Sequence, residues 1–130
     1  MPRYVILKTQ VSHYRKVLKH AKHATDDPPS VFANDVVLIH CEAEGRTVPP
    51  RVTHRMDCQN VRPALPGESR RLFGRSWRWI IDGKNLTRLA SDIPINRFGK
   101  ASGKNYGQGA QRFVYLDPED VAELQASGLL

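Results

Sequence analysis

The chain has 130 residues, of which 40% are hydrophobic and 25% charged, a balance that excludes an intrinsically disordered protein and predicts one domain over residues 1–130. No apolar run approaches the ~20 residues of a membrane helix, the N-terminus has no secretory pattern, and the two cysteines form no C-x-x-C pair. We therefore expect a cytoplasmic protein with reduced thiols and no membrane partner, whose net charge of +7 favours anionic partners.

The first half of the chain predicts a strand, a helix and a second strand. Residues 4–9 read Tyr-Val-Ile-Leu-Lys-Thr, an aromatic and β-branched run that indicates a buried strand. Apolar residues then recur at helical spacing over residues 13–24, with Ser12 as the expected N-cap and a pair of prolines after the helix. Asn34, which tolerates left-handed backbone, precedes the clearest strand, residues 36–41.

The second half predicts short strands separated mostly by loops. These strands are expected at residues 51–57, 77–81 and 113–116. Asp82 and Gly83 would end one strand in a turn, and the glycine-punctuated residues 98–109 would form a polar loop. Asp117 caps a final helix, with Pro118 at its first position. Because a parallel doubly wound sheet would need a helix between every two strands, the pattern favours an α+β fold, a small mixed or antiparallel β-barrel flanked by helices.

The order of these motifs resembles that of the EVE domain of the PUA-like superfamily, distant kin of the YTH readers of methylated RNA. Residues 4–9 resemble its opening strand, residues 34–40 its apolar strand ending in His, residues 77–95 its strand with a following Leu to Pro-Ile run, and residues 113–130 its closing strand and acidic-capped helix. Residues 24–34 depart from the pattern, since they are short and proline-rich where the family carries a Trp or Asn of the pocket. The resemblance implies a PUA-like barrel that recognises a modified base in DNA or RNA.

Basic residues are concentrated before residue 117. Residues 1–116 hold 20 basic and 9 acidic side chains, a balance of +11, and arginine dominates residues 46–78. Such a field attracts the phosphates of DNA or RNA. Clustered arginines after a Pro- and Gly-marked loop favour a phosphate clamp, which we expect at Arg70, Arg71 and Arg75. The alternatives are a basic face for an acidic protein partner and a basic surface without a nucleic-acid role.

Aromatic and amide side chains in the second half indicate a base-binding pocket. Trp77 and Trp79 are two residues apart, so on a strand both rings lie on one face, which is either core or a surface that stacks on a base. The glycine-rich loop adds amides that read base edges and a tyrosine that stacks, unless it is an ordinary exposed turn. Lys8 ends a buried strand, where its ammonium either reaches solvent or donates to a base or phosphate. The expected base-binding residues are Trp77, Trp79, Asn105, Tyr106, Gln108, Lys8 and Thr9.

A small nucleoside amidohydrolase or hydrolase on a related PUA-like scaffold is the alternative function. Lys8, Thr9 and Glu42 would then form the acid–base set, because burial tunes a lysine near an acid and a hydroxyl toward neutrality. A buried, close Lys8–Glu42 pair would favour this enzyme, whereas an aromatic pocket without that pair would favour the binding module. His20 and His23, at i and i+3 of the predicted helix, have metal-ligand spacing but no nearby Cys, Asp or Glu to complete a set. The binding hypothesis therefore includes no metal, no cofactor and no catalytic residue.

The charge of residues 1–116 leads to a first prediction. Binding to DNA or RNA should weaken steeply as salt rises, because each phosphate that the protein neutralises adds ~0.7–0.9 to the negative slope of log K against log salt concentration. Fluorescence anisotropy with labelled oligonucleotides at several salt concentrations measures that slope. A flat response, or no binding at low ionic strength, would contradict the nucleic-acid hypothesis.

Overall fold

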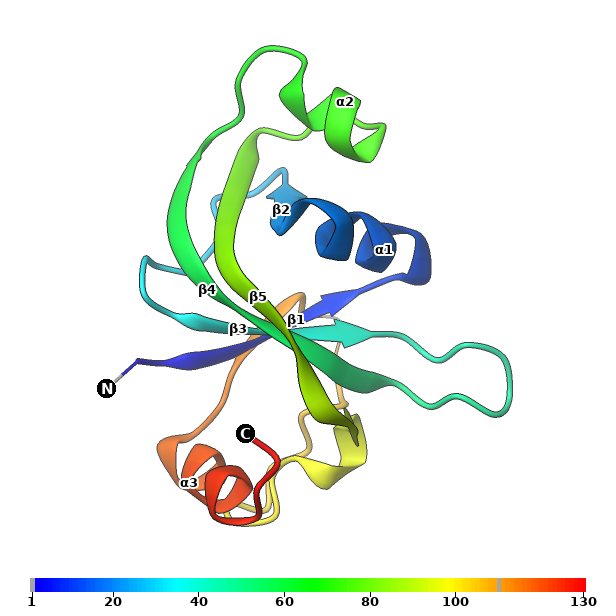
Figure 1. Cartoon of the computed structure of the whole chain (residues 1–130), viewed down its shortest axis with the longest axis vertical. Coiled ribbons are helices and arrows are strands. Elements are labelled where there is room, and N and C mark those ends of the chain that lie inside the picture. Colours follow the sequence, from blue (N-terminus) through cyan, green and yellow to red (C-terminus); the bar gives the residue numbers. More distant parts are fainter. Residues whose placement is uncertain (1, 110) are drawn as a thin grey trace.

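One curled sheet organises the part of the chain that the computed structural model describes, residues 2–109 and 111–130 (Figure 1). Its strands, six in those residues, are β1 (Tyr4–Thr9), β2 (Lys22–Thr25), β3 (Val36–Cys41), β4 (Arg51–Pro63), β5 (Trp79–Pro94) and β6 (Phe113–Tyr115). The same residues form helices α1 (Val11–His20), α2 (Glu68–Phe73) and α3 (Pro118–Ala126) and a 3-10 turn, η1 (Ile95–Arg97). None of these helices has the length and apolar character needed to cross a bilayer. The strand order is β2-β5-β4-β3-β1-β6, in which β1 and β3 run parallel and the other neighbours antiparallel.

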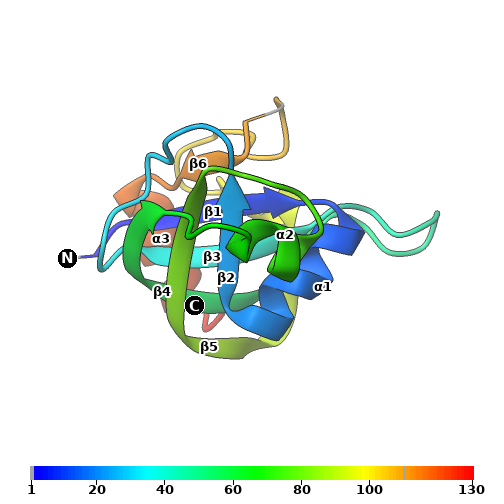
Figure 2. The ribbon, with the colours of Figure 1, turned by 90° about the horizontal axis from the view of Figure 1, so that it is seen from above.

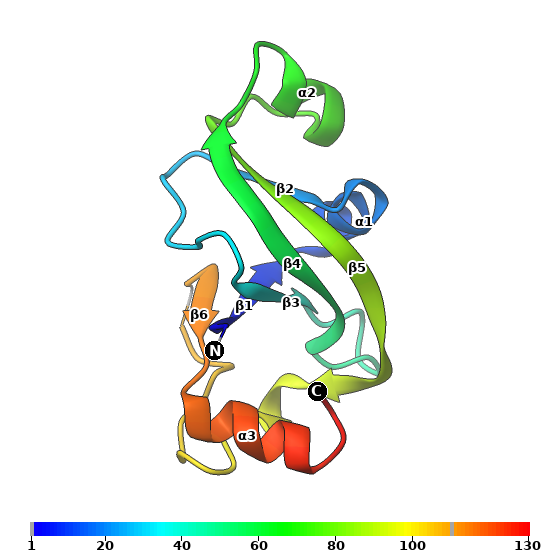
Figure 3. The ribbon, with the colours of Figure 1, turned by 60° about the vertical axis from the view of Figure 1, so that its left-hand side comes forward.

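The sheet is bent rather than flat. β4 and β5 form a long ribbon that runs from the α2 end of the molecule to the α3 end (Figure 3), and register shifts mark irregularities along it. The two edge strands, β2 and β6, approach each other (Figure 2), so that the ring centroids of His23 and Phe113 are 5.6 Å apart. This mixed α+β half-barrel flanked by helices confirms the predicted fold class.

Each face of the sheet has its own core, because side chains alternate along the central strands. Val5 and Leu7 of β1 pack with α1 and α2, whereas Tyr4 and Ile6 pack with α3, and β3 alternates in the same way. Figure 1 shows α1 and α2 on one side of these strands and α3 on the other. A parallel strand that is covered on both faces has a continuous apolar run in its sequence, and for this reason both β1 and β3 were predictable.

The first helix is shorter than predicted. α1 begins at Val11 with Gln10 as its N-cap, rather than after Ser12, and it ends where Ala21 adopts left-handed backbone with a φ of 51°. Residues 22–24, predicted as the last turn of this helix, instead belong to β2, which pairs with β5. Pairing with a strand distant in sequence overrides the local helical spacing.

The second half contains longer strands and one more helix than predicted. β4 and β5 both continue beyond their predicted ends, and α2 occupies part of the predicted arginine-rich loop. Gly67 and Gly74 flank α2 with φ of 75° and 76°, a backbone that glycine adopts at little cost. The left-handed backbone at Asn34, with a φ of 74°, and the start of α3 after Asp117 are confirmed.

Gly83 does not form the predicted turn but lies within β5. A Cβ atom at this position would be 2.3 Å from Met56 Sδ and 2.8 Å from the carbonyl oxygen of Ala21. The amide of Gly83 also donates a hydrogen bond to that carbonyl, at 2.8 Å. The glycine therefore lets β5 pass directly against the end of α1. The turn prediction is wrong because a glycine in a sequence can indicate either a tight turn or a close approach of two backbones, and here it is the second.

Replacing Gly83 with alanine should reduce the free energy of unfolding by about 1–3 kcal/mol, because the added methyl group overlaps Met56 and the backbone of Ala21. Urea denaturation at fixed pH measures the loss. Lys84→Ala, at the next and exposed position of the same strand, is the matched control and should change stability by no more than about 0.5 kcal/mol. Equal losses in the two variants would contradict the close-approach explanation.

Candidate functional site

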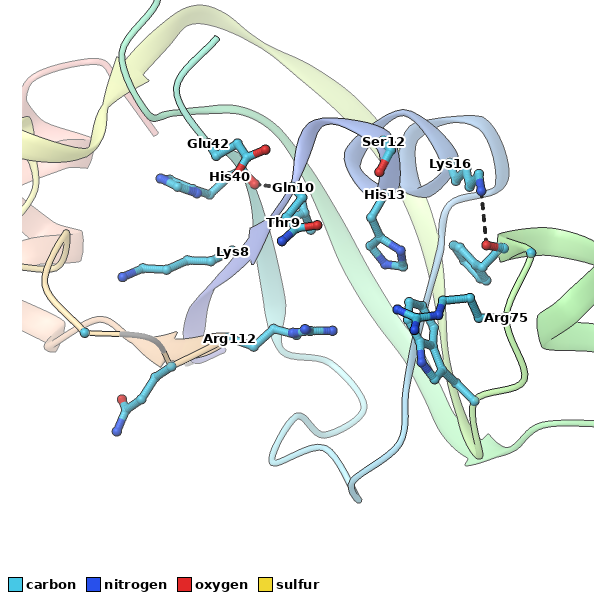
Figure 4. A pocket seen from close by; sticks show the side chains of 15 residues that line it. Lys8, Thr9, Gln10, Ser12, His13, Lys16, His40, Glu42, Arg75 and Arg112 are labelled. Carbon is cyan, nitrogen blue, oxygen red and sulfur yellow. Dashed lines mark hydrogen bonds between the residues drawn. The ribbon is translucent and has the colours of Figure 1, made fainter. Parts of the chain in front are cut away.

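A cavity of about 740 Å³ lies where β1 ends and α1 begins (Figure 4). Its walls come from the ends of β1 and β3, the first turns of α1, the segment joining α2 to β5, and the segment that leads into β6. The parallel pairing of β1 with β3 explains this convergence, because the carboxyl ends of both strands meet at one edge of the sheet. A cavity of this size is typical of sites that hold a small molecule or part of a polymer.

One side of the cavity is an aromatic wall formed by His13, Phe73 and Trp77. The His13 ring stacks on Phe73, with centroids 4.9 Å apart and planes 26° apart. It meets the Trp77 ring at 63°, with centroids 5.2 Å apart. The wall therefore joins rings from α1, from the end of α2 and from the segment before β5. Such a surface offers π-faces against which a planar ligand stacks.

Ser69 holds the segment that carries Trp77. Its hydroxyl donates to the carbonyl oxygen of Arg75 at 2.6 Å and accepts the amide N–H of Trp77 at 3.0 Å. Ser69 is itself buried in α2, whose neighbouring residue Glu68 forms a two-oxygen ion pair with Arg62 of β4 at 2.7 Å per contact. The position of the aromatic wall is thus fixed by polar contacts that reach back to the sheet.

His13, half-buried in the aromatic wall, pairs with the fully buried His23 behind it. His13 Nε2 and His23 Nδ1 are 2.7 Å apart, a distance at which one nitrogen donates to the other. Burial, together with the positive charges of Arg112 and Lys16, lowers the pKa of His13 to about 4. Burial also holds the pKa of His23 well below its ordinary value. Both rings are therefore neutral at pH 7.

The prediction that His20 and His23 lie on one helix is wrong, because His20 ends α1 and His23 belongs to β2. The chain leaves the helix at Ala21, so the two side chains no longer share a helical face. In residues 2–109 and 111–130, no group of three His, Cys, Asp or Glu side chains converges as metal ligands.

The cavity has a positive electrostatic character. Four cationic side chains line it: Lys8, Lys16, Arg75 and Arg112. Glu42 is the carboxylate among the described lining residues. Lys16 Nζ donates to the carbonyl oxygen of Phe73 at 3.0 Å, and the guanidinium of Arg75 lies 6.0 Å from the centroid of the Trp77 ring. Cations beside an aromatic wall attract an anion that carries a planar group.

The sheet end of the cavity is polar. Lys8 and His40 are opposite each other in the register of β1 and β3 and both line the cavity. The buried hydroxyl of Thr9 donates to the carbonyl oxygen of His40 at 2.8 Å and so ties the two strand ends together. Burial, with Lys8 and Arg51 nearby, lowers the pKa of His40 to about 4. Burial also lowers the pKa of Lys8.

The prediction that Trp77 and Trp79 share one face of a strand is wrong. β5 begins at Trp79, two residues later than expected, so Trp77 lies in the preceding segment. Trp77 lines the cavity, whereas Trp79 pairs with Thr25 of β2 and is not among the described residues that line it. Only one of the two tryptophans is therefore positioned to contact a ligand there.

The predicted loop of Asn105, Tyr106 and Gln108 is not brought to the aromatic wall. Tyr106 is 4% exposed in the core beneath α3, where its hydroxyl donates to Asp120 Oδ2 at 2.6 Å and accepts the amide N–H of Asp117 at 3.0 Å. Asn105 and Gln108 are exposed, and none of the three occurs among the described residues that line the cavity. A tyrosine anchored in this way has no free ring face for a base.

The predicted phosphate clamp is divided between the cavity and the outer surface. Arg75 lines the cavity, whereas Arg70 and Arg71 are exposed on α2. Since Phe73 of the aromatic wall ends the same helix, all three arginines lie at the same end of the molecule as the cavity.

Lys8, Thr9 and Glu42, the residues of the alternative enzyme, all border the cavity. Within the described part of the chain, however, no ion pair joins Lys8 to Glu42. Glu42 is exposed, and its Oε1 accepts the amide N–H of Val11 at 3.2 Å. The buried, close lysine–glutamate pair expected of the enzyme is thus missing from these residues.

Sequence reasoning did not identify His13, Phe73, His40 and Arg112 as site residues. Their positions depend on strand pairing and on the packing of α2 against α1, which no local pattern specifies. His40 alone carried a usable signal, because a polar residue at the carboxyl end of a fully buried strand faces the edge where ligands bind in many sheets.

No protein-family model and no curated protein sequence matches this chain. Solved structures are similar in fold. ASCH from Zymomonas mobilis matches with a TM-score of 0.67 at 9% identity, over 95% of this chain and 94% of that chain. A mutant form of the same protein matches with a TM-score of 0.71 at 10% identity, over 98% and 99%. The YTH domain of a Zygosaccharomyces rouxii protein, solved in complex with N6-methyladenosine RNA, matches with a TM-score of 0.59 at 10% identity, over 99% and 85%.

These matches establish the fold, which is the PUA-like fold of ASCH and YTH domains. The likeness is one of fold alone and does not single out the EVE domain named by the sequence resemblance.

The buried imidazoles predict how stability depends on pH. Because the pKa values of His13, His23 and His40 are lower in the folded chain than in the unfolded chain, the unfolded chain binds more protons below about pH 6.5. Stability should therefore fall as pH decreases from about 6.5 toward 4, by up to about 1.4 kcal/mol per pH unit for each imidazole. Urea denaturation between pH 7.5 and 5 measures this slope.

A matched pair of variants tests the origin of that slope. His13→Gln removes one half-buried titrating ring and should make the slope shallower. His20→Gln removes a ring from the last turn of α1 whose pKa is lowered to a smaller extent, by burial and the neighbouring cations, and should make the slope shallower by less than His13→Gln does. A slope unchanged in His13→Gln would contradict the assignment.

Proposed function

We propose that this protein binds single-stranded DNA or RNA and holds one base, preferentially a modified base, against the aromatic wall. The observation that carries the proposal is the meeting of three aromatic rings and four cationic side chains in one cavity. Base stacking on an aromatic ring contributes ~1–3 kcal/mol per base and tolerates different sequences. Contacts to phosphates supply the remaining affinity and its salt dependence.

Each group of side chains has a distinct role in this proposal. The half-buried Trp77 ring provides the surface for the base, and buried Phe73 supports the wall behind it. A cationic methylated base adds a cation–π attraction of up to ~2 kcal/mol when water is excluded. Arg75 and Arg112 neutralise the phosphates beside that base. Arg70 and Arg71, exposed on α2, extend the positive surface along the strand away from the cavity.

The comparisons support this proposal at the level of the fold. A YTH domain with the same fold was solved with N6-methyladenosine RNA, so a PUA-like barrel is able to hold a methylated base. The EVE-like order of sequence motifs favours the same activity. An extruded base loses stacking worth a few kcal/mol, least in a single strand, which is why we propose a single-stranded ligand.

A hydrolase remains the second candidate because Lys8 and Thr9 border the cavity and burial lowers the pKa of Lys8. The exposed position of Glu42 and its bond to Val11 favour the binding module. Release of a modified group from a nucleoside incubated with the protein, lost in Lys8→Ala, would support the hydrolase instead.

Trp77→Ala should weaken binding of single-stranded oligonucleotides about 5–150-fold, the equivalent of one lost stacking contact, and should reduce the preference for a modified base. Trp79→Ala is the matched control, since both rings are partly buried but only Trp77 lines the cavity. The control should lose a comparable amount of stability and retain binding. Fluorescence anisotropy with methylated and unmethylated oligonucleotides, together with thermal melts, measures both effects. Equal affinity in the two variants would contradict the proposal.

A further inference from the structure

The His40 ring is buried and lacks a hydrogen-bond partner among the described residues. It is 6% exposed, lines the cavity, and neither ring nitrogen has a hydrogen-bond partner within residues 2–109 and 111–130. A buried polar group without a partner costs about as much as a lost hydrogen bond, so such groups in folded proteins generally have a reason to be there. At the same strand ends the buried Thr9 hydroxyl does have a partner, the carbonyl oxygen of His40.

The chemistry of this ring limits what it would bind. Burial and the neighbouring cations keep the imidazole neutral at pH 7, so one nitrogen donates and the other accepts. A phosphate has only acceptor oxygens at this pH and would satisfy one nitrogen at most. The edge of a nucleobase carries donors and acceptors side by side, so it can pair with the donor or with the acceptor nitrogen of the ring. Lys8, opposite His40 in the strand register, adds a donor for a base carbonyl.

His40 and the aromatic wall are at different ends of the cavity. Figure 4 shows Lys8 and His40 on one side, His13, Lys16 and Arg75 on the other, and Arg112 extending between them. Arg112 lies close enough to His13 to lower the pKa of that ring by its charge. A cation between two surfaces that suit bases matches the chemistry of a phosphate that links two nucleosides.

We infer that the Lys8–His40 end of the cavity binds the edge of a second base, so that the ligand is a dinucleotide step: one base on the aromatic wall, its neighbour at His40, and the linking phosphate at Arg112. This inference rests on the proposed function and adds to it that the protein reads the neighbour of the stacked base. His40 is then a specificity-determining residue, because its donor and acceptor distinguish one base edge from another.

The test compares nucleoside monophosphates with a panel of dinucleoside monophosphates by NMR titration, with a single-stranded oligonucleotide as the reference. A dinucleoside monophosphate has the second base but carries less negative charge than a mononucleotide, so charge alone favours the mononucleotide. We expect the best dinucleoside monophosphate to bind at least about tenfold more tightly, the equivalent of one well-made hydrogen-bonded contact. The imidazole nitrogen resonances of His40 should shift with the dinucleoside monophosphate and not with the mononucleotide.

His40→Phe keeps the ring shape and removes both nitrogens. It should abolish the tenfold advantage, leave mononucleotide binding unchanged, and hold or raise the melting temperature, because an unpartnered polar ring is replaced by an apolar one. His54→Phe is the matched control: its Nδ1 lies 2.7 Å from Thr53 Oγ1, and its loss should lower the melting temperature without changing the dinucleotide advantage.

The outcomes separate the two proposals. Binding of the oligonucleotide without a dinucleotide advantage, or an advantage that persists in His40→Phe, would overturn this inference and leave the proposed function standing. Unshifted His40 nitrogen resonances in the parent protein would overturn it even if the variant failed to fold. No binding of the oligonucleotide at low salt would overturn both.

Discussion

The parallel pairing of β1 with β3 is the constraint on which the rest of the structure depends. Both strands are buried on both faces, so one pair of strands supplies side chains to two separate cores. The backbone of these two strands therefore belongs to both cores, the one beneath α1 and α2 and the one beneath α3. Each side chain of the strands packs in only one of the two. Because the pair is parallel, the carboxyl ends of both strands meet at one edge, and the polar residues that follow the apolar runs, Lys8 and His40, converge there.

The aromatic side of the cavity depends on a second constraint, a network of ion pairs. Arg62 of β4 contacts Glu68 of α2 and Asp82 of β5, and Lys22 of β2 also pairs with Asp82. The Arg62 guanidinium lowers the pKa of Glu68 to about 2, so this carboxylate stays charged over the physiological range. Four elements are joined by these groups, and the short helix α2 is held close to α1. Together with the bond from Lys16 to the Phe73 carbonyl oxygen, this anchor positions Phe73 against His13.

The sequence predicted what depends on neighbouring residues and missed what depends on distant ones. The doubly buried strands and the helix after Asp117 were predictable because their apolar runs and capping residues are local. β2 was not predicted because residues 22–24 continue the helical pattern and become part of a strand only by pairing with β5. For the site, Lys8, Thr9, Arg75 and Trp77 were predicted as ligand contacts and do line one cavity. Tyr106 looked equally functional, but its partner Asp120 comes from a helix that the loop composition does not reveal.

The two-sided burial of β1 has a consequence for how its alignment is maintained. In a strand with one wet face, a slip of one residue exposes apolar side chains and is strongly resisted. In β1 a slip of one residue would exchange the apolar side chains of one face for those of the other. Hydrophobic burial alone therefore specifies the register of β1 only weakly. Polar contacts fix the register instead. The Thr9 hydroxyl donates to the His40 carbonyl oxygen at one end of β1, and the Arg3 guanidinium donates to the Asp35 carboxylate at the other. These polar contacts at the two ends of β1, rather than its apolar middle, keep Lys8 at the cavity.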